Sequence, residues 1–160
     1  MSERANALAE RIEQGAEALA GYVEGFTASE WKMIVPGEER SVGVLVHHVA
    51  SSYQAEVDLA SELASGKPIA GVTMDVIDGI NADHAKEFAQ VAKEDVLTLL
   101  RENSKVAADR VRKFTDSELD NANKVSLNAN APLTTQFFLE DHALRHSFTH
   151  LESIRERLGK

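Results

Sequence analysis

Apolar residues recur every three or four positions along most of the chain, which is the spacing of one face of an α-helix. Leu8, Ile12 and Leu19 are examples from the first such segment. Glycine and proline interrupt the pattern between segments, and proline cannot continue a helical hydrogen-bond ladder. The pattern predicts four long helices and a shorter, less periodic one, over residues 3–26, 41–64, 75–88, 93–114 and 133–158.

This set of helices predicts an all-α fold, a four-helix bundle with an extra short helix, as a single domain over residues 1–160. Thr73 and either Thr134 or Thr135 are expected near helix starts. Residues 115–132 are polar, rich in asparagine and aspartate, and expected to be irregular. An irregular stretch of this length in a compact domain often lies over a functional surface.

The composition narrows the class of protein. The 160 residues are 43% hydrophobic and 27% charged, which are ordinary values for a globular domain. The net charge of -9 disfavours nucleic acid and anionic membrane as partners, because both bind basic surfaces. The chain has no cysteine, which excludes disulfides, thiolate ligands and a cysteine nucleophile. No signal-peptide core or bilayer-spanning run is present, so a cytoplasmic protein is expected.

Five of the six histidines lie in two of the predicted helices, where they could share a metal ion. Neutral imidazole is a common metal ligand, and helical positions i and i+4 point the same way. At about 100° per residue, His146 and His150 fall beside the apolar face of the last helix, whereas His142 drifts toward its polar face. In the earlier helix, His48 shares a face with apolar residues and His47 with polar ones. His48 is therefore the stronger candidate, although spacing alone leaves His47 open.

The remaining candidate chemistry is sparse. His84 has no histidine close in sequence and is expected to be an ordinary hydrogen-bonded or exposed side chain. The same wheel places Phe137 and Phe148 on the apolar face of the last helix. Glu56 and Asp141 are candidates to orient histidines, which metal sites commonly require. There is no glycine-rich phosphate loop, His-Glu-x-x-His or Gly-x-Ser-x-Gly motif.

Three segments, in this order, resemble the DinB-like superfamily, in particular its DinB-2 branch. Trp31 precedes the first of them, and the resemblance spans nearly the whole chain. The segments are Ser41-Val-Gly-Val-Leu-Val-His-His-Val-Ala50, Ile80-Asn-Ala-Asp-His-Ala-Lys-Glu-Phe88 and His146-Ser-Phe-Thr-His-Leu-Glu-Ser-Ile-Arg155.

The resemblance implies a four-helix bundle with a long crossover connection, often a homodimer, that holds a divalent metal with three histidines. By position these are His48, His146 and His150, the same three that the helical wheel favours. Relatives in this superfamily include mycothiol-dependent maleylpyruvate isomerase and bacillithiol transferases. In one branch Arg-Gly-Gln follows the final histidine, where this chain has Leu151-Glu-Ser153.

Two classes of function are consistent with these observations. The first is a metal-dependent enzyme, of hydrolase or thiol S-transferase type, acting on a small molecule. Zinc, nickel or iron would suit the nitrogen ligands, and any thiol would be an external low-molecular-weight one. The second class is a non-catalytic ligand-binding or structural dimeric bundle of the same fold.

Overall fold

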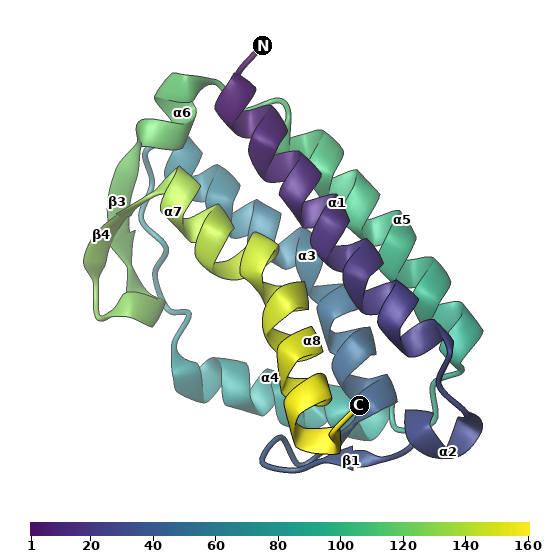
Figure 1. The fold of residues 1–160 in the computed structure, drawn as a ribbon. Coiled ribbons are helices and arrows are strands. Elements are labelled where there is room, and N and C mark those ends of the chain that lie inside the picture. The colour runs from purple at the N-terminus through teal and green to yellow at the C-terminus, as the bar shows by residue number, and fades with distance from the viewer.

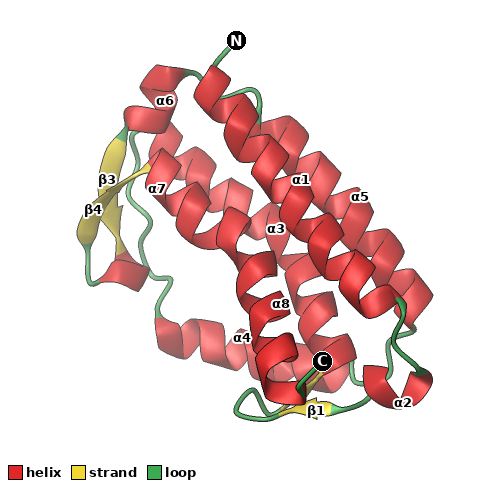
Figure 2. Ribbon diagram, viewed as in Figure 1, coloured by secondary structure: helices red, strands yellow, loops and turns green.

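The computed structural model describes residues 1–160, and four long helical segments form its framework (Figures 1 and 2). Three are single helices: α1 (Glu3–Glu24), α3 (Val42–Ala64) and α5 (Lys93–Val111). The fourth consists of three consecutive pieces, α7 (Thr135–Leu139), η2 (Glu140–Leu144) and α8 (Arg145–Leu158). The predicted all-α four-helix bundle is therefore confirmed.

Side-chain caps fix where most of these helices begin. Ser41 Oγ accepts a hydrogen bond from the Val44 amide, and Thr134 caps the last segment in the same way. Such caps satisfy amide groups that lack a partner within the helix. The predicted cap at Thr73 is also present, at the start of α4 (Met74–Glu87).

The crossover connection gives the bundle its topology. Asn103 of α5 donates to the Ala50 carbonyl of α3, and Arg110 of α5 donates to Gln54 further along α3. Residue numbers rise together along both helices, so α3 and α5 run parallel. A parallel pair requires a long connection, and helix α4 lies within it, crossing one end of the bundle (Figure 1).

A short hairpin lies at the same end of the bundle, beside the C-terminal helix (Figure 1). Helix α2 (Ala28–Trp31) leads into strands β1 (Ile34–Val35) and β2 (Arg40–Ser41), which pair antiparallel. Arg157 of α8 donates to the Pro36 carbonyl in the turn between the strands. The hairpin is thereby fixed against the C-terminal helix. No helix combines the length and apolar character that a membrane crossing requires.

The prediction of an irregular stretch over residues 115–132 is wrong. This stretch contains α6 (Asp116–Asp120), β3 (Ala122–Val125) and the 3₁₀ turn η1 (Ser126–Asn128), and β4 (Ala131–Thr134) completes an antiparallel hairpin with β3. Asn121 and Asn123 donate from their side chains to carbonyls at the end of α3. The asparagines that suggested a loop attach the hairpin to the bundle instead, a role that only tertiary contacts reveal.

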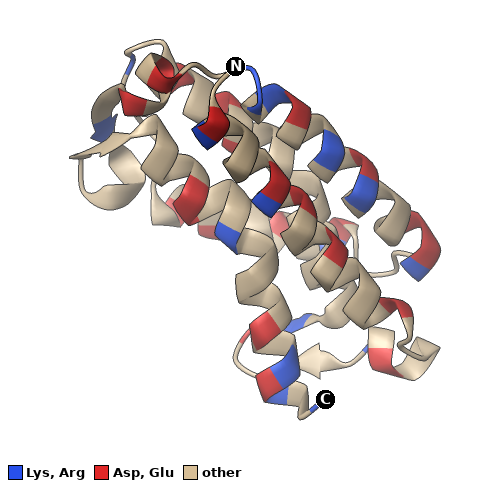
Figure 3. Ribbon diagram, turned by 45° about the horizontal axis from the view of Figure 1, so that its top comes forward, with Lys and Arg blue, Asp and Glu red and all other residues tan.

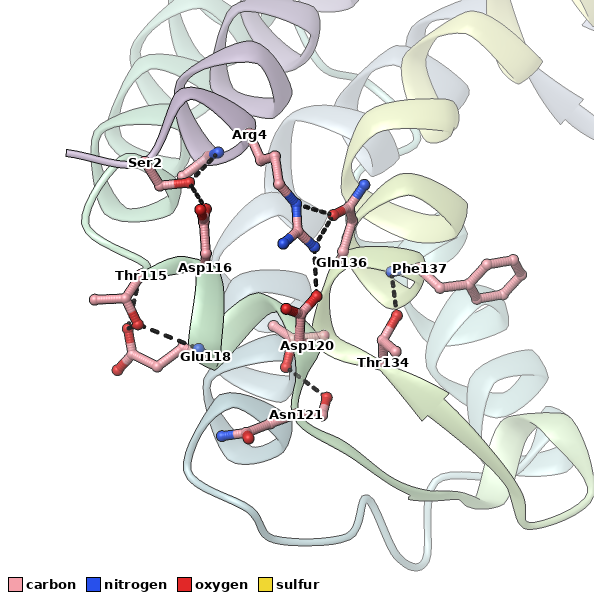
Figure 4. Close-up of polar contacts among 12 residues, drawn as sticks. Ser2, Arg4, Thr115, Asp116, Glu118, Asp120, Asn121, Thr134, Gln136 and Phe137 are labelled. Carbon is pink, nitrogen blue, oxygen red and sulfur yellow. Dashed lines mark hydrogen bonds and ion pairs between the residues drawn. The ribbon is translucent and has the colours of Figure 1, made fainter.

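Polar contacts attach α6 and α7 to the start of α1 (Figure 4). The Arg4 guanidinium donates to Gln136 Oε1 at 2.9 Å and lies 2.6 Å from Asp120 Oδ1. Ser2, the cap of α1, also donates to Asp116. One arginine therefore joins three elements at this end of the bundle.

Opposite charges face each other across α1 and α5 on the outside of the bundle. Arg101 of α5 contacts Glu17 of α1 at 3.0 Å, and Arg112 contacts Glu13 at 2.6 Å. Figure 3 shows basic and acidic residues interspersed along these helices. Beneath them lies one apolar core, in which Tyr53 and Phe138 are the largest fully buried side chains.

The last helix is not the continuous α-helix that was predicted. Its middle piece, η2, is a π-helix, which adds a residue to a turn and rotates the upstream segment by about 100°. As a result Phe137, predicted to be on the apolar face, is 46% exposed, whereas Leu139 is fully buried. Phe148, which lies after the π-helix, is half-buried as a member of the apolar face should be.

Candidate metal centre

Three imidazoles from two helices converge near the end of the bundle that α4 crosses. His48 lies on α3, and His146 and His150 lie one turn apart on α8. One ring nitrogen from each lies within 4.8 Å of the others. The closest approach is between His48 Nε2 and His146 Nε2, which are 2.9 Å apart. The sequence predicted this set of three, and the structure brings its members together.

The same geometry distinguishes the two adjacent histidines near the start of α3, because His48 belongs to the group of three and His47 does not. His47 lies outside the group of three: its Nδ1 is 2.8 Å from His84 Nε2, and its ring stacks on Phe88 at 4.0 Å. The sequence placed His47 on a polar face, yet it is only 8% exposed, because α4 packs over that face. His84, expected to have no histidine near it, is the partner that α4 supplies.

His142 also lies outside the group, as the helical wheel indicated. Its ring packs against Phe138, with 4.3 Å between the ring centroids. Asp141, proposed from the sequence to orient a ligand histidine, instead contacts Arg145 at 2.9 Å and lies 3.7 Å from His142 Nε2.

Two carboxylates lie behind the converging imidazoles. Glu56 Oε1 is 2.9 Å from His146 Nδ1, and Glu38 Oε1 is 3.9 Å from His150 Nδ1. A carboxylate beside Nδ1 favours the tautomer that carries its proton there, which leaves Nε2 free to bind a metal. Glu56 was predicted from the sequence. Glu38 was missed, because it lies in the β1–β2 turn, far from α8 in sequence.

Burial keeps the imidazoles of His48 and His150 neutral. Burial, together with the neighbouring His146 and His150, lowers the pKa of His48 from 6.5 to about 2. Burial likewise lowers the pKa of His150 to about 4, with a further contribution from His146. Imidazole must be unprotonated to bind a metal, so both rings are in the binding form at neutral pH.

A cavity of about 570 Å³ opens beside the three histidines. Its walls come from α3, α4, η1, α7, η2 and α8, so most of the elements that follow α3 in the chain contribute. His48 and His146 line it directly, together with Glu56. Its volume is typical of small-molecule sites.

The class of protein is defined by a four-helix bundle that contains a parallel pair of helices and brings three histidines together beside a cavity. The family model of the DinB superfamily matches residues 11–154, and the chain therefore belongs to this superfamily. The resemblance found in the sequence is confirmed. No curated protein matches the chain in sequence.

Among solved structures, the chain is similar to YfiT from Bacillus subtilis, described as a probable metal-dependent hydrolase with an unusual four-helix bundle topology. The TM-score is 0.74 over 99% of this chain and 90% of the YfiT chain, at 18% sequence identity. At this identity the likeness shows a shared fold.

Proposed function

We propose that the protein is a divalent-metal-dependent enzyme that acts on a small molecule, with His48, His146 and His150 as the metal ligands. The observation that carries the proposal is the convergence of three imidazoles beside an open cavity. The residues fit such an ion: tetrahedral zinc holds ligand nitrogens about 3.3 Å apart, close to the 2.9 Å between His48 Nε2 and His146 Nε2. Zinc, nickel and iron all suit this donor set.

A divalent ion with three protein ligands has a further position for water or a thiolate and lowers the pKa of the group bound there. The chain's own residues would prepare the site for this chemistry. Glu56 and Glu38, which lie beside the Nδ1 atoms of His146 and His150, would orient these imidazoles, and burial keeps the His150 ring unprotonated. The cavity places a substrate next to His48 and His146.

The reaction proposed is attack on that substrate by water, as in a hydrolase, or by an external low-molecular-weight thiol, as in a thiol S-transferase. Because the chain has no cysteine, the thiol would have to enter with the substrate. Hydrolysis needs no second organic component and is the reaction to test first.

The test begins with protein purified without a histidine tag. We expect elemental analysis to find about one equivalent of zinc, nickel or iron, and His48→Ala, His146→Ala and His150→Ala each to remove it, while His142→Ala retains it. Each metal-loaded form would then be assayed on a panel of small esters, amides and thiol acceptors, with and without a small thiol. Activity with water alone identifies a hydrolase, and activity only with thiol identifies a transferase.

A protein that binds none of these metals and is unaffected by chelator would contradict the proposal. So would full biological activity in all three alanine variants, a result that favours a non-catalytic binding module.

A further inference from the structure

Helix α4 differs from the other long helices because none of its residues is buried. It nevertheless carries several large apolar side chains, of which Met74 and Ile80 are each 57% exposed. An apolar helix face ordinarily packs on the core. Here Met74, Ile77 and Ile80 face the cavity beside the three histidines and form one of its walls.

The opposite walls of the cavity are also apolar. Leu59 of α3, Leu127 of the η1 turn and Phe138 of α7 line it, and Phe138 is almost fully buried. The cavity therefore offers an apolar ligand contacts on several sides.

Away from the candidate metal ligands, the charges around the cavity disfavour an anionic group on a ligand. Arg145 is the one lysine or arginine in its lining, and Asp141 already neutralises it at 2.9 Å. The remaining formal charge in the lining is the carboxylate of Glu56. An anionic group bound in this part of the cavity would lose water without gaining an unpaired cation, which is costly.

Polar groups for a reacting end come from α3 and α8 as well as from α4, and those of α4 lie close to the candidate metal ligands. Asn81 and His84, one turn apart on α4, line the cavity, and the His84 ring lies 5.8 Å from that of His48. His84 Nδ1 is buried without a hydrogen-bond partner. A polar substrate group would meet these side chains next to the candidate metal ligands.

We propose that the substrate is an uncharged molecule with an apolar chain or ring, which binds against α4 while its single polar reacting group faces the histidines. The proposal rests on the proposed metal-dependent function for the orientation of the substrate. The apolar character of the cavity can be tested separately.

Three hydroxamic acids, whose common head group chelates zinc, test the proposal on the zinc-loaded protein: acetohydroxamate, hexanohydroxamate and the monohydroxamate of adipic acid. Each methylene removed from water tightens binding by about fourfold at most, so hexanohydroxamate should bind on the order of 100-fold more tightly than acetohydroxamate. Because of its carboxylate, the adipic compound should bind at least about tenfold more weakly than hexanohydroxamate. Calorimetry measures all three affinities.

A pair of variants on α4 provides the matched control. Ile80→Asp places a charge in the cavity wall, whereas Val76→Asp changes a residue that is 46% exposed and outside the cavity. We expect Ile80→Asp to weaken hexanohydroxamate about tenfold or more without changing acetohydroxamate, and Val76→Asp to change neither by more than about twofold. Equal affinity for the three probes, or equal losses in the two variants, would overturn the proposal.

A measurement without metal separates this proposal from the proposed function. With ¹³C-labelled methionine methyl groups, zinc-free protein should show a shift of the Met74 signal on addition of hexanamide, while the signal of Met33, outside the cavity, stays in place. The carboxylated analogue adipamate should shift Met74 far less. If zinc fails to bind, the proposed metal-dependent function is wrong. The shift of the Met74 signal still tests whether the cavity binds an apolar ligand. An unmoved Met74 rejects the apolar cavity even if zinc binds.

Discussion

At the scale of single residues, the candidate site depends on burial that keeps the imidazoles of His48 and His150 unprotonated. His48, His146 and His150 crowd one another, so a proton on any one of them would repel protons on the others. Burial and this mutual proximity act in the same direction on the pKa of His48 and of His150. The fold therefore keeps the ring nitrogens of His48 and His150 unprotonated, which is the form that can bind a metal ion.

The first prediction concerns the pH dependence of stability in the metal-free protein. The pKa values of His150 and His84 fall from 6.5 in the unfolded chain to about 4 in the fold, mainly through burial. The unfolded state therefore binds more protons than the folded state between pH 6.5 and 4, and stability decreases as the pH falls through that range. For His150 the loss is at most about 3 kcal/mol.

Urea unfolding at pH 7.5, 6 and 4.5 measures this effect. The midpoint should decrease at each step, and His150→Phe, which cannot be protonated, should reduce the decrease. A midpoint that is constant from pH 7.5 to 4.5 would contradict the assignment.

The second prediction concerns Glu56, which lies 2.9 Å from His146 Nδ1. Glu56→Gln keeps the size of the side chain but removes the charge that favours the metal-binding tautomer. We expect the metal affinity to fall about 10- to 100-fold. The circular dichroism spectrum of the variant should match that of the unchanged protein. Asp58→Asn on the same helix is the control, because Asp58 is exposed and forms only a surface ion pair with Arg110. Competition with a fluorescent zinc chelator measures both, and equal affinities in the two variants would rule out this role for Glu56.

The sequence predicted the residues of the site that regular helix geometry relates. His146 and His150 follow from i, i+4 spacing, and His48 from the apolar face of its helix. Glu38 and His84 could not be predicted in this way, because the β1–β2 turn and the crossover helix bring them to the site by tertiary packing. Their positions depend on contacts between segments, which periodicity does not encode.

At the scale of elements, a glycine allows helix α8, which carries His146 and His150, to lie close to α1. A Cβ atom at Gly15 would overlap Ser147 Oγ and lie 2.8 Å from Phe148 Cε2. Ser147 is fully buried and lies between His146 and His150 in sequence. The distance between α1 and α8 therefore contributes to the position of two of the three imidazoles.

The third prediction is that Gly15→Ala destabilises the protein by about 1–3 kcal/mol, because the added methyl group overfills a packed interface. It should also weaken metal binding, since α8 must move. The control is Gly21→Ala on the same helix, where no atom lies within 4 Å of the new Cβ atom. There alanine should stabilise the helix by up to about 1 kcal/mol. Chemical unfolding compares the two variants, and the same sign of change in both would refute the packing argument.

The helices themselves were well predicted from periodicity, to within a few residues at their ends. The short elements between and within them were not, and the π-helix η2 and the β3–β4 hairpin show why. The π-helix η2 differs from an α-helix by one residue, and Phe137 on its upstream side was assigned to the wrong face as a result. The β3–β4 hairpin is short and polar, and its stability comes from contacts such as Asn121 to the end of α3. Neither feature has a local pattern that distinguishes it.

At the scale of the whole molecule, the homodimer implied by family resemblance stays a prediction. Light scattering during size-exclusion chromatography tests it directly. The expected mass is twice the 17.5 kDa of one chain. A mass equal to that of one chain at micromolar concentration would contradict it.

The last prediction follows from where the three histidines lie in the chain. His48 and His146 are 98 residues apart in sequence, and their helices meet only in the folded bundle. A metal ion that binds all three histidines therefore binds the folded state far more tightly than the unfolded one and stabilises the whole molecule. At a free zinc concentration 100 times the Kd, the gain is about 2.7 kcal/mol.

For a domain of this size, such a gain raises the Tm by roughly 5–10 °C. Calorimetric melting of protein stripped with chelator and titrated with zinc measures the shift. His48→Ala should abolish it, since the ion would then bridge only two positions on α8, whereas His142→Ala should preserve it. The two histidines left in His48→Ala lie on adjacent turns of α8, which can form without the bundle. If the Tm shift persists in this variant, the ion does not join α3 to α8.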